Sequence, residues 1–354
     1  MNREKRRITV GIIVGIFLMG VMYLWVRDGR AIKADSGYRL VMGTLARIVA
    51  VAADSDTAES CIEAALKELE NIELLCSTYK VDSGISMVNR NAYKAPVRVS
   101  EPVFEVLQRA IKFSRISDGA FDVTIGPLME LWHSANDANC LPSDNELQQA
   151  RSRVGYEKLI LDANQMSVRF VADGMRIDLG GIAKGYGIDK AVEAMRRVGA
   201  TGGMVDVGGD IRVFGAPPQG RGKWLIGLQN PDRAEESKHL LVLELTDGAV
   251  ATSGGYRRFT LIEGKKYSHI IDTKTGSSSD KLTSVTIISK SATDADALAT
   301  AVSVMGTEKG LALIESLPET EAILISSHPS FGVIKTRGAE KYTPKGSKLP
   351  RVEL

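Results

Sequence analysis

Residues 177–189 constrain the fold of this chain more than any other stretch. They combine a short apolar segment, a pair of glycines and the beginning of a helix, in the sequence IDLGGIAKGYGID. The apolar residues before Asp178 predict a strand. The residues after the glycines predict a helix, because its apolar positions recur at helical spacing, at Ile188, Ala191, Val192 and Met195. The stretch therefore predicts a strand, a tight turn and a helix in close succession.

The turn has the composition of an anion-binding site. Gly180 and Gly181 lack a Cβ atom, so the backbone there can adopt positive φ and a ligand can approach it closely. The free N–H groups at the start of the helix favour an anion, and Lys184 adds a positive charge. The spacing matches neither the dinucleotide-binding fingerprint nor the P-loop. The residues alone thus leave two interpretations, a phosphate site and an ordinary glycine-rich turn.

Helical and strand patterns are interleaved along the rest of the chain. Apolar periodicity and capping residues predict helices over residues 54–75, 100–116, 143–154 and 292–305, with polar loops at 77–91 and 136–145. Runs rich in β-branched residues predict strands at 40–51, 159–161, 167–171, 175–179, 283–289 and 322–325, and a series of strands between 204 and 272. The predicted fold class is α+β, a mixed α/β body with a β-rich middle.

Charge and cysteine content exclude several classes of protein. The net charge of the 354 residues is only +2, and the first seven residues hold four basic side chains against one acidic one, so the body has no basic surface typical of nucleic-acid binding. Cys61, Cys76 and Cys140 lack the spacing of a disulfide framework or a zinc site, and the first two are expected to fill apolar space. The four histidines are scattered and predict no histidine-rich metal centre.

The N-terminus predicts a membrane anchor. Residues 8–26 form an uncharged run close to the roughly 20 residues that span a bilayer, and this run follows the basic residues 1–7. A cleavable signal peptide has a shorter apolar region and a better cleavage site. We therefore expect residues 1–7 in the cytoplasm, a transmembrane signal anchor at 8–26 and a linker at 27–37, with the body outside the cytoplasm.

Asp296 and Thr300 are four residues apart on a predicted helix, so their oxygens leave the same face. One interpretation is structural: Thr293 would be the N-cap, and Asp296 the favoured acid three residues later. The other is a hard cation such as Mg²⁺, which prefers a carboxylate, a hydroxyl, a main-chain carbonyl and phosphate oxygens. Spacing does not decide between them.

His269 lies in the segment SHIID, which predicts a half-buried strand. It could be a hydrogen-bonded core histidine. It could also be a general base, because an unperturbed pKa near 6.5 suits removal of a proton from a hydroxyl at neutral pH.

Eight motifs, taken together and in order, resemble the ApbE family of FAD:protein FMN transferases over about residues 38–335. They are MGT at Met42, STY at Ser77, DGAFDVTIGPL at Asp118, IDLGGIAKGYGID at Ile177, DVGGDIRV at Asp206, ATSGGYRRF at Ala251, SHIIDTKTG at Ser268 and ATDADALATAVSVMG at Ala292. The resemblance implies a flavin transferase domain at 38–335, followed by a tail at 336–354.

The resemblance also implies the roles of individual residues. Contacts with FAD are expected from Met42, Tyr79, Ala120, Phe121, Asp122, Asp178 and Lys184, with Tyr79 stacking on an aromatic ring of FAD. The metal, Mg²⁺, is expected at Asp296, Thr300 and the carbonyl of Gly181. His269 becomes the candidate base that activates the acceptor hydroxyl.

The implied activity is Mg²⁺-dependent transfer of FMN from FAD to a Thr or Ser hydroxyl of a target protein, with release of AMP. The implied partners are target flavoprotein subunits of membrane electron-transfer complexes or extracytoplasmic flavoproteins. With the anchor, this places the protein in the bacterial inner membrane, with its catalytic domain on the periplasmic side. Two alternatives remain, an FAD pyrophosphatase that yields FMN and AMP, and a non-catalytic, membrane-tethered flavin carrier.

Overall fold

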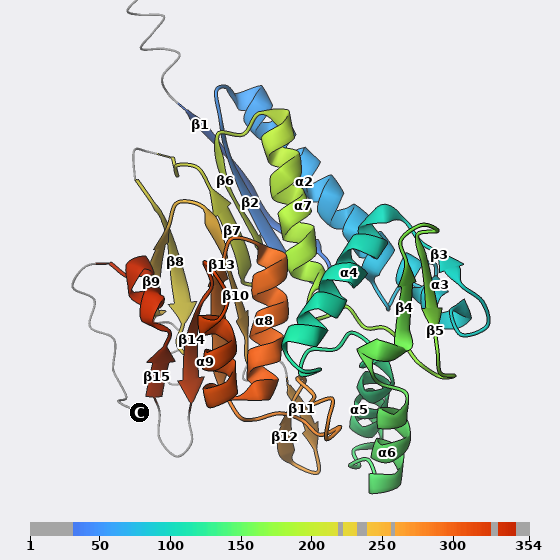
Figure 1. The fold of residues 1–354 in the computed structure, drawn as a ribbon. Helices are drawn as coiled ribbons and strands as arrows, with labels where there is room; N and C mark the ends of the chain where they lie inside the picture. The colour runs from blue at the N-terminus through green and yellow to red at the C-terminus, as the bar shows by residue number, and fades with distance from the viewer. Residues whose placement is uncertain (1–30, 219–221, 232–238, 256–258, 327–331, 345–354) are drawn as a thin grey trace, which may run out of the picture.

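An eight-stranded sheet is the centre of the computed structural model, which describes residues 31–218, 222–231, 239–255, 259–326 and 332–344. Every neighbouring pair in this sheet is antiparallel. In spatial order the strands are β1 (Ile32–Val41), β2 (Thr44–Ala52), β6 (Gly202–Val207), β7 (Asp210–Phe214), β10 (Gly248–Ser253), β13 (Ser284–Ser289), β14 (Glu321–Ser326) and β15 (Gly332–Lys335) (Figure 1).

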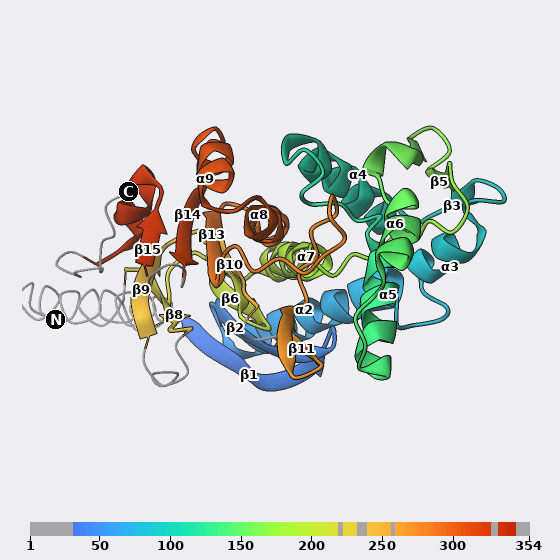
Figure 2. The ribbon, with the colours of Figure 1, turned by 90° about the horizontal axis from the view of Figure 1, so that it is seen from below.

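Both faces of the sheet are covered. Figure 2 shows four helices on one side and a β-hairpin on the other: α2 (Ser55–Cys76), α7 (Ala183–Val198), α8 (Ala292–Met305) and α9 (Thr307–Glu315) against β8 (Trp224–Gln229) and β9 (His239–Leu245). Alternation along β10 fits this sandwich, because Ala249 and Ala251 belong to the core under the helices and Val250 to the core under the hairpin. The β-rich middle and the mixed α/β class predicted from the sequence are confirmed.

A second group of elements packs beside α7 and α8. It holds the helices α3 (Gly84–Asn91), α4 (Glu101–Ile116), α5 (Gly126–Ala138) and α6 (Asp144–Ser152) and the small sheet β3 (Val97–Arg98), β5 (Ser167–Phe170) and β4 (Leu159–Asp162). The hairpin of β11 (Phe259–Ile262) and β12 (Lys265–Ser268) packs on α5 and α6 through an apolar cluster of its own. Two 3₁₀ turns complete the described elements, η1 (Tyr156–Lys158) and η3 (Arg337–Tyr342).

Local signals placed the helix ends well. Asp54 accepts a hydrogen bond from the Thr57 N–H at 2.8 Å and so begins α2. Ser143 and Glu146 form a capping box at the start of α6. The predicted helices at 54–75, 100–116, 143–154 and 292–305 are all present within two residues of their bounds.

Three expectations from the sequence are wrong. Residues 175–179 are not a strand, because Arg176 alone makes a single bridge, to Ile125. The loop predicted at 77–91 contains α3, which begins at the capping residue Ser83. The loop predicted at 136–145 overlaps the end of α5, which continues until Asn139 adopts a left-handed conformation. The Ser83 side chain caps α3, a local signal that the polar composition concealed, and residues 136–138 of α5 are helical although they are exposed.

Residues 8–26, predicted as a transmembrane anchor, lie outside the described residues. Within the described part of the chain, no helix has the length and apolar character to cross a bilayer.

Candidate active site between helices α7 and α8

The beginning of α7 lies directly against α8, because small residues allow the two backbones to touch. A Cβ atom on Gly185 would lie 2.2 Å from the Ala292 carbonyl oxygen. A Cβ atom on Gly181 would lie 3.0 Å from the Thr300 hydroxyl and 3.2 Å from the Phe121 ring. Neither Gly180 nor Gly181 has positive φ, so that expectation is wrong. Gly181 matters because another group approaches its backbone closely.

A cluster of three charged side chains joins α7, α8 and β7. The Lys184 ammonium lies 3.2 and 3.3 Å from the two carboxylate oxygens of Asp296, and it also donates to Asp210. Both carboxylates are almost fully buried, at 3% and 4% exposed. One ammonium therefore faces two buried carboxylates, and the cluster carries a net charge of −1.

This cluster bears on the two interpretations of the turn, a phosphate site and an ordinary glycine-rich turn. The anion at the beginning of α7 is the chain's own carboxylate, because the Gly185 N–H donates to Asp296 at 3.1 Å. The charge of Lys184 is already more than balanced by its two carboxylate partners, so it does not stand free for a phosphate. The turn as found is thus acidic rather than basic.

The pKa values reflect this arrangement. Burial raises the pKa of Asp296 to about 6, the neighbouring Asp210 acts in the same direction, and Lys184 opposes both. Burial alone would lower the pKa of Lys184, but the two carboxylates raise it well above its usual value, so the lysine stays charged.

The oxygen donors here fit a hard divalent cation. Asp296 and Thr300 lie one turn apart on α8, and the backbone of Gly181 faces the Thr300 hydroxyl. A carboxylate has about four lone-pair positions, and the hydrogen bonds of Asp296 with Lys184 and Gly185 leave some of them open. A buried net negative charge is also unfavourable without a further cation. Within the described residues, no group of three His, Cys, Asp or Glu side chains forms a metal cluster of the usual kind.

Asp296 does not cap its own helix, α8. The N-cap of α8 is Ser291, whose hydroxyl accepts from the Asp294 N–H, so the expected N-cap Thr293 is wrong. The beginning of α8 is instead held by Asp189 of α7, which accepts from the N–H groups of Ala292 and Thr293 at 2.9 and 3.0 Å. The capping pair of Thr293 and Asp296 expected in α8 is therefore absent, and the hydrogen-bonding role of Asp296 is toward the beginning of α7.

Asp178 and Asp122 differ in their surroundings. Asp178 accepts from the Gly180 N–H at 2.7 Å; burial raises its pKa, while the charge of His133 on α5 lowers it. Asp122 is buried as expected, but its carboxylate accepts from the Thr124 and Tyr156 N–H groups. The Asp122 carboxylate thus holds the turn together.

Met42 and Tyr79 lie at the C-terminal end of α2. Met42 occupies the β1–β2 turn with φ of 53°, and its N–H donates to Glu73 at 3.1 Å. Lys80, next to Tyr79, pairs with the same Glu73 at 3.5 Å. The Met42 sulfur reaches α7, 3.1 Å from where a Cβ on Gly187 would lie. The Tyr79 side chain is 84% exposed, so its ring is open for stacking.

His269 is exposed and lies one residue beyond β12, so the expected half-buried strand position is wrong. Its neighbour Ile270 packs with Ala120 and with Val304, one turn beyond Thr300 on α8. These contacts place the His269 segment against the C-terminal end of α8, about two turns beyond Asp296 of the charged cluster.

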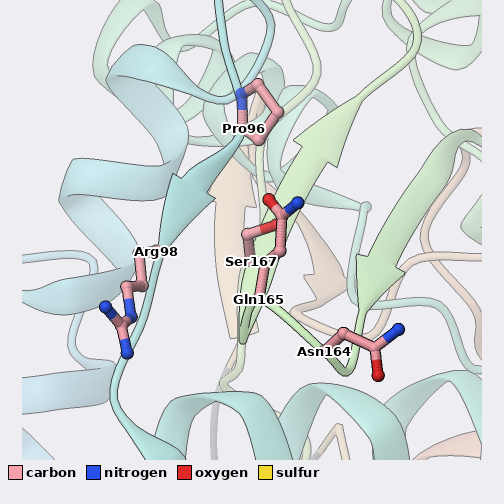
Figure 3. A pocket seen from close by; sticks show the side chains of 5 residues that line it. All are labelled: Pro96, Arg98, Asn164, Gln165 and Ser167. Atoms are coloured by element: carbon pink, nitrogen blue, oxygen red, sulfur yellow. The ribbon is translucent and has the colours of Figure 1, made fainter.

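Two surface hollows lie away from this cluster. Figure 3 shows the first, about 350 Å³, on the small sheet, lined by Pro96, Arg98, Asn164, Gln165 and Ser167. The second, about 660 Å³, lies between α6 and the loop after His269, and its lining includes Arg151, Thr273 and Thr275. Neither contains a predicted site residue, so the charged cluster remains the candidate site.

Sequence reasoning did not assign Asp189, Asp210 or Arg212. Arg212 of β7 pairs with Asp189 at 2.6 Å, and Asp210 pairs with Lys184. Asp210 and Arg212 belong to the motif DVGGDIRV, and this motif was the one signal in the sequence that could have pointed to them. Their partners are distant in sequence, so no spacing could reveal the pairs.

The fold and the site define a mixed α/β protein with an acidic, oxygen-rich cluster between two helices. Residues 42–324 match the model of the ApbE family, and the chain belongs to that family. It is 36% identical to an FAD:protein FMN transferase of Vibrio cholerae, over 79% of this chain and 82% of the relative, and 35% identical to one of Treponema pallidum, over 84% and 86%.

Solved structures agree with the family assignment. The ApbE protein of Thermotoga maritima superposes with a TM-score of 0.79 at 31% identity, covering 89% of this chain and 100% of that one. The flavin transferase ApbE of Vibrio cholerae gives 0.77 at 31% identity, covering 88% and 99%.

Proposed function

We propose that this protein transfers FMN from FAD to a Thr or Ser hydroxyl of a target flavoprotein in a Mg²⁺-dependent reaction. Family membership and relatives named FAD:protein FMN transferase support the flavin transfer. The observation that carries the metal-dependent form is the buried cluster of Lys184, Asp210 and Asp296, which has one negative charge in excess beside the Thr300 hydroxyl.

Asp296, Thr300 and the Gly181 carbonyl would hold the cation. When bound, Mg²⁺ supplies charge neutralisation for a pyrophosphate group, which otherwise repels an incoming nucleophile. The exposed ring of Tyr79 and the Met42 turn would contact the rest of FAD, with Ala120, Phe121 and Asp178. Lys184 would contact FAD there while it remains paired with Asp296.

In the transfer, the acceptor hydroxyl oxygen forms a bond to the FMN-side phosphorus and the bond from that phosphorus to the AMP oxygen breaks. His269 would take the hydroxyl proton. Its exposed position suits this role, because the hydroxyl arrives on another protein and must reach the base from outside.

Incubation of the protein with FAD, Mg²⁺ and an acceptor protein tests this proposal. The expected result is a mass increase on the acceptor equal to FMN minus water, with AMP released in equal amount and with no product in EDTA. A good acceptor that remains unmodified would refute the transfer. Release of AMP at the same rate without acceptor would indicate FAD hydrolysis instead, and intact FAD after hours would indicate a carrier.

We also propose that residues 8–26 anchor the protein in the bacterial inner membrane with the catalytic domain on the periplasmic side, near flavoprotein subunits of electron-transfer complexes. The support is the uncharged run after the basic residues 1–7. Protease treatment of spheroplasts tests the orientation: the domain should be digested without lysis, and protection until lysis would refute it.

A further inference from the structure

Asp210 is a buried acid that is neither a cation ligand nor an FAD contact in the proposed transfer. It begins β7, directly after the glycine pair of the motif DVGGDIRV, and it is 4% exposed. Gly208 and Gly209 form the β6–β7 turn with φ of 65° and 92°, a conformation that favours glycine at both positions. This turn pairs Asp210 with Val207 and so fixes where the carboxylate lies.

Two neighbours orient the Asp210 carboxylate. One oxygen accepts from the Thr252 N–H of β10 at 3.2 Å, and the other accepts from Lys184. Lys184 is the residue that also contacts Asp296, at 3.2 and 3.3 Å. Asp210 therefore reaches the expected metal ligand only through the lysine.

The contact between Asp210 and Lys184 changes the net charge that a cation would meet at Asp296. A lysine paired with Asp296 alone would leave that carboxylate neutralised, and a divalent cation would have to compete with an ammonium already in place. With Asp210 present, one ammonium is shared by two carboxylates, and a negative charge remains for the cation. Charges interact strongly at such short range in a partly buried cluster.

We propose that Asp210 is a positioning residue that engages Lys184 and thereby keeps Asp296 available to a divalent cation. The inference rests on the proposed function, because it takes Asp296 to be a metal ligand. It adds a residue that sets cation affinity without being a ligand.

The test compares the full chain with its Asp210→Asn variant, which removes the charge and keeps the shape. Binding of Mn²⁺ alone, followed by the electron paramagnetic resonance signal of the free ion, should weaken at least about tenfold in the variant. The Mg²⁺ concentration for half-maximal FMN transfer should rise to a similar extent. The rate at saturating Mg²⁺ should stay close to that of the unchanged protein. Asp210→Glu, which keeps the charge, should recover most of the Mn²⁺ affinity.

Asp189→Asn is a matched structural control, because Asp189 is also buried and also joins neighbouring elements, in this case α7 and α8, yet it pairs with Arg212 outside the cluster. It should lower thermal stability and leave Mn²⁺ affinity unchanged. Equal loss of Mn²⁺ affinity in both variants would show that α8 is merely displaced and would overturn the inference. So would unchanged Mn²⁺ binding by Asp210→Asn, or a rate that stays low at saturating Mg²⁺.

The proposed function fails separately from this inference. It fails if the unchanged protein transfers no FMN, or if Asp296→Asn binds Mn²⁺ and transfers FMN normally. If the unchanged protein transfers FMN, and Asp210→Asn binds Mn²⁺ as tightly as the unchanged protein does, the inference about Asp210 fails. The proposed function then still stands.

Discussion

Substitution of Gly185 by alanine should destabilise this protein strongly, although helix propensity predicts the reverse. Gly185 lies in the first turn of α7 without positive φ, where alanine is usually better than glycine by about 1 kcal/mol. The Cβ atom of alanine, however, would lie 2.2 Å from the Ala292 oxygen, 2.6 Å from its carbonyl carbon and 2.8 Å from the Thr293 Cα. All three are backbone atoms, which cannot turn away as a flexible side chain can.

The magnitude follows from what must move. Relief of the clash requires α7 and α8 to separate by roughly 1 Å, and overpacking of this kind costs about 1–3 kcal/mol or more. The separation also weakens the hydrogen bond from the Gly185 N–H to Asp296, and bonds to charged groups contribute about 1.5–3 kcal/mol. After subtraction of the propensity gain, the free energy of unfolding should fall by about 2–5 kcal/mol.

Urea unfolding of Gly185→Ala and Gly187→Ala measures this effect against a control in the same helix. A Cβ atom on Gly187 meets only the ends of flexible side chains, the Met42 sulfur at 3.1 Å and a Leu69 methyl at 3.3 Å. Gly187→Ala should therefore stay within about 1 kcal/mol of the unchanged protein. If Gly185→Ala is as stable as the unchanged protein or as Gly187→Ala, the close contact between the helices is not as described.

Three further predictions concern the site and the cysteines. Asp296→Asn should reduce FMN transfer by about 100-fold or more in a mass-spectrometric assay, because the amide no longer provides a charge for the cation. The far-ultraviolet circular dichroism should stay unchanged, because the amide can still accept from the Gly185 N–H. Retained activity would contradict the metal role. Because burial raises the pKa of Asp296 to about 6, the Mg²⁺ concentration for half-maximal transfer should rise as the pH falls below about 6, and a constant value from pH 5 to 8 would contradict this. Iodoacetamide at neutral pH should modify exposed Cys140 in the folded protein and spare Cys61 and Cys76, which are both buried. Burial also raises the pKa of the Cys76 thiol to about 12, so the reactive thiolate is scarce. Modification of all three cysteines before unfolding would refute the packing.

Much of the candidate site could be named from the sequence, but its electrostatics could not. Asp296, Thr300, Gly181 and Lys184 come together in the structure as their motifs implied. The excess negative charge at the turn could not be predicted, because Asp296 is 112 residues from Lys184 along the chain and reaches it only through tertiary packing. Asp210 was not assigned a role for the same reason.

Local chemistry explains what the sequence determined by itself. Capping residues such as Asp54 and Ser143, and the apolar periodicity of α7, act within a few neighbouring residues, so most strands and the helices α2, α4, α6, α7 and α8 were predictable, whereas α3 and α5 were not. Tertiary structure alone decided that residues 175–179 form no strand, that α7 touches α8 at Gly185, and that one lysine is shared by two buried carboxylates. Those outcomes depend on distances between atoms that are remote in the chain, and folding sets these distances through the packing of helices on the antiparallel sheet.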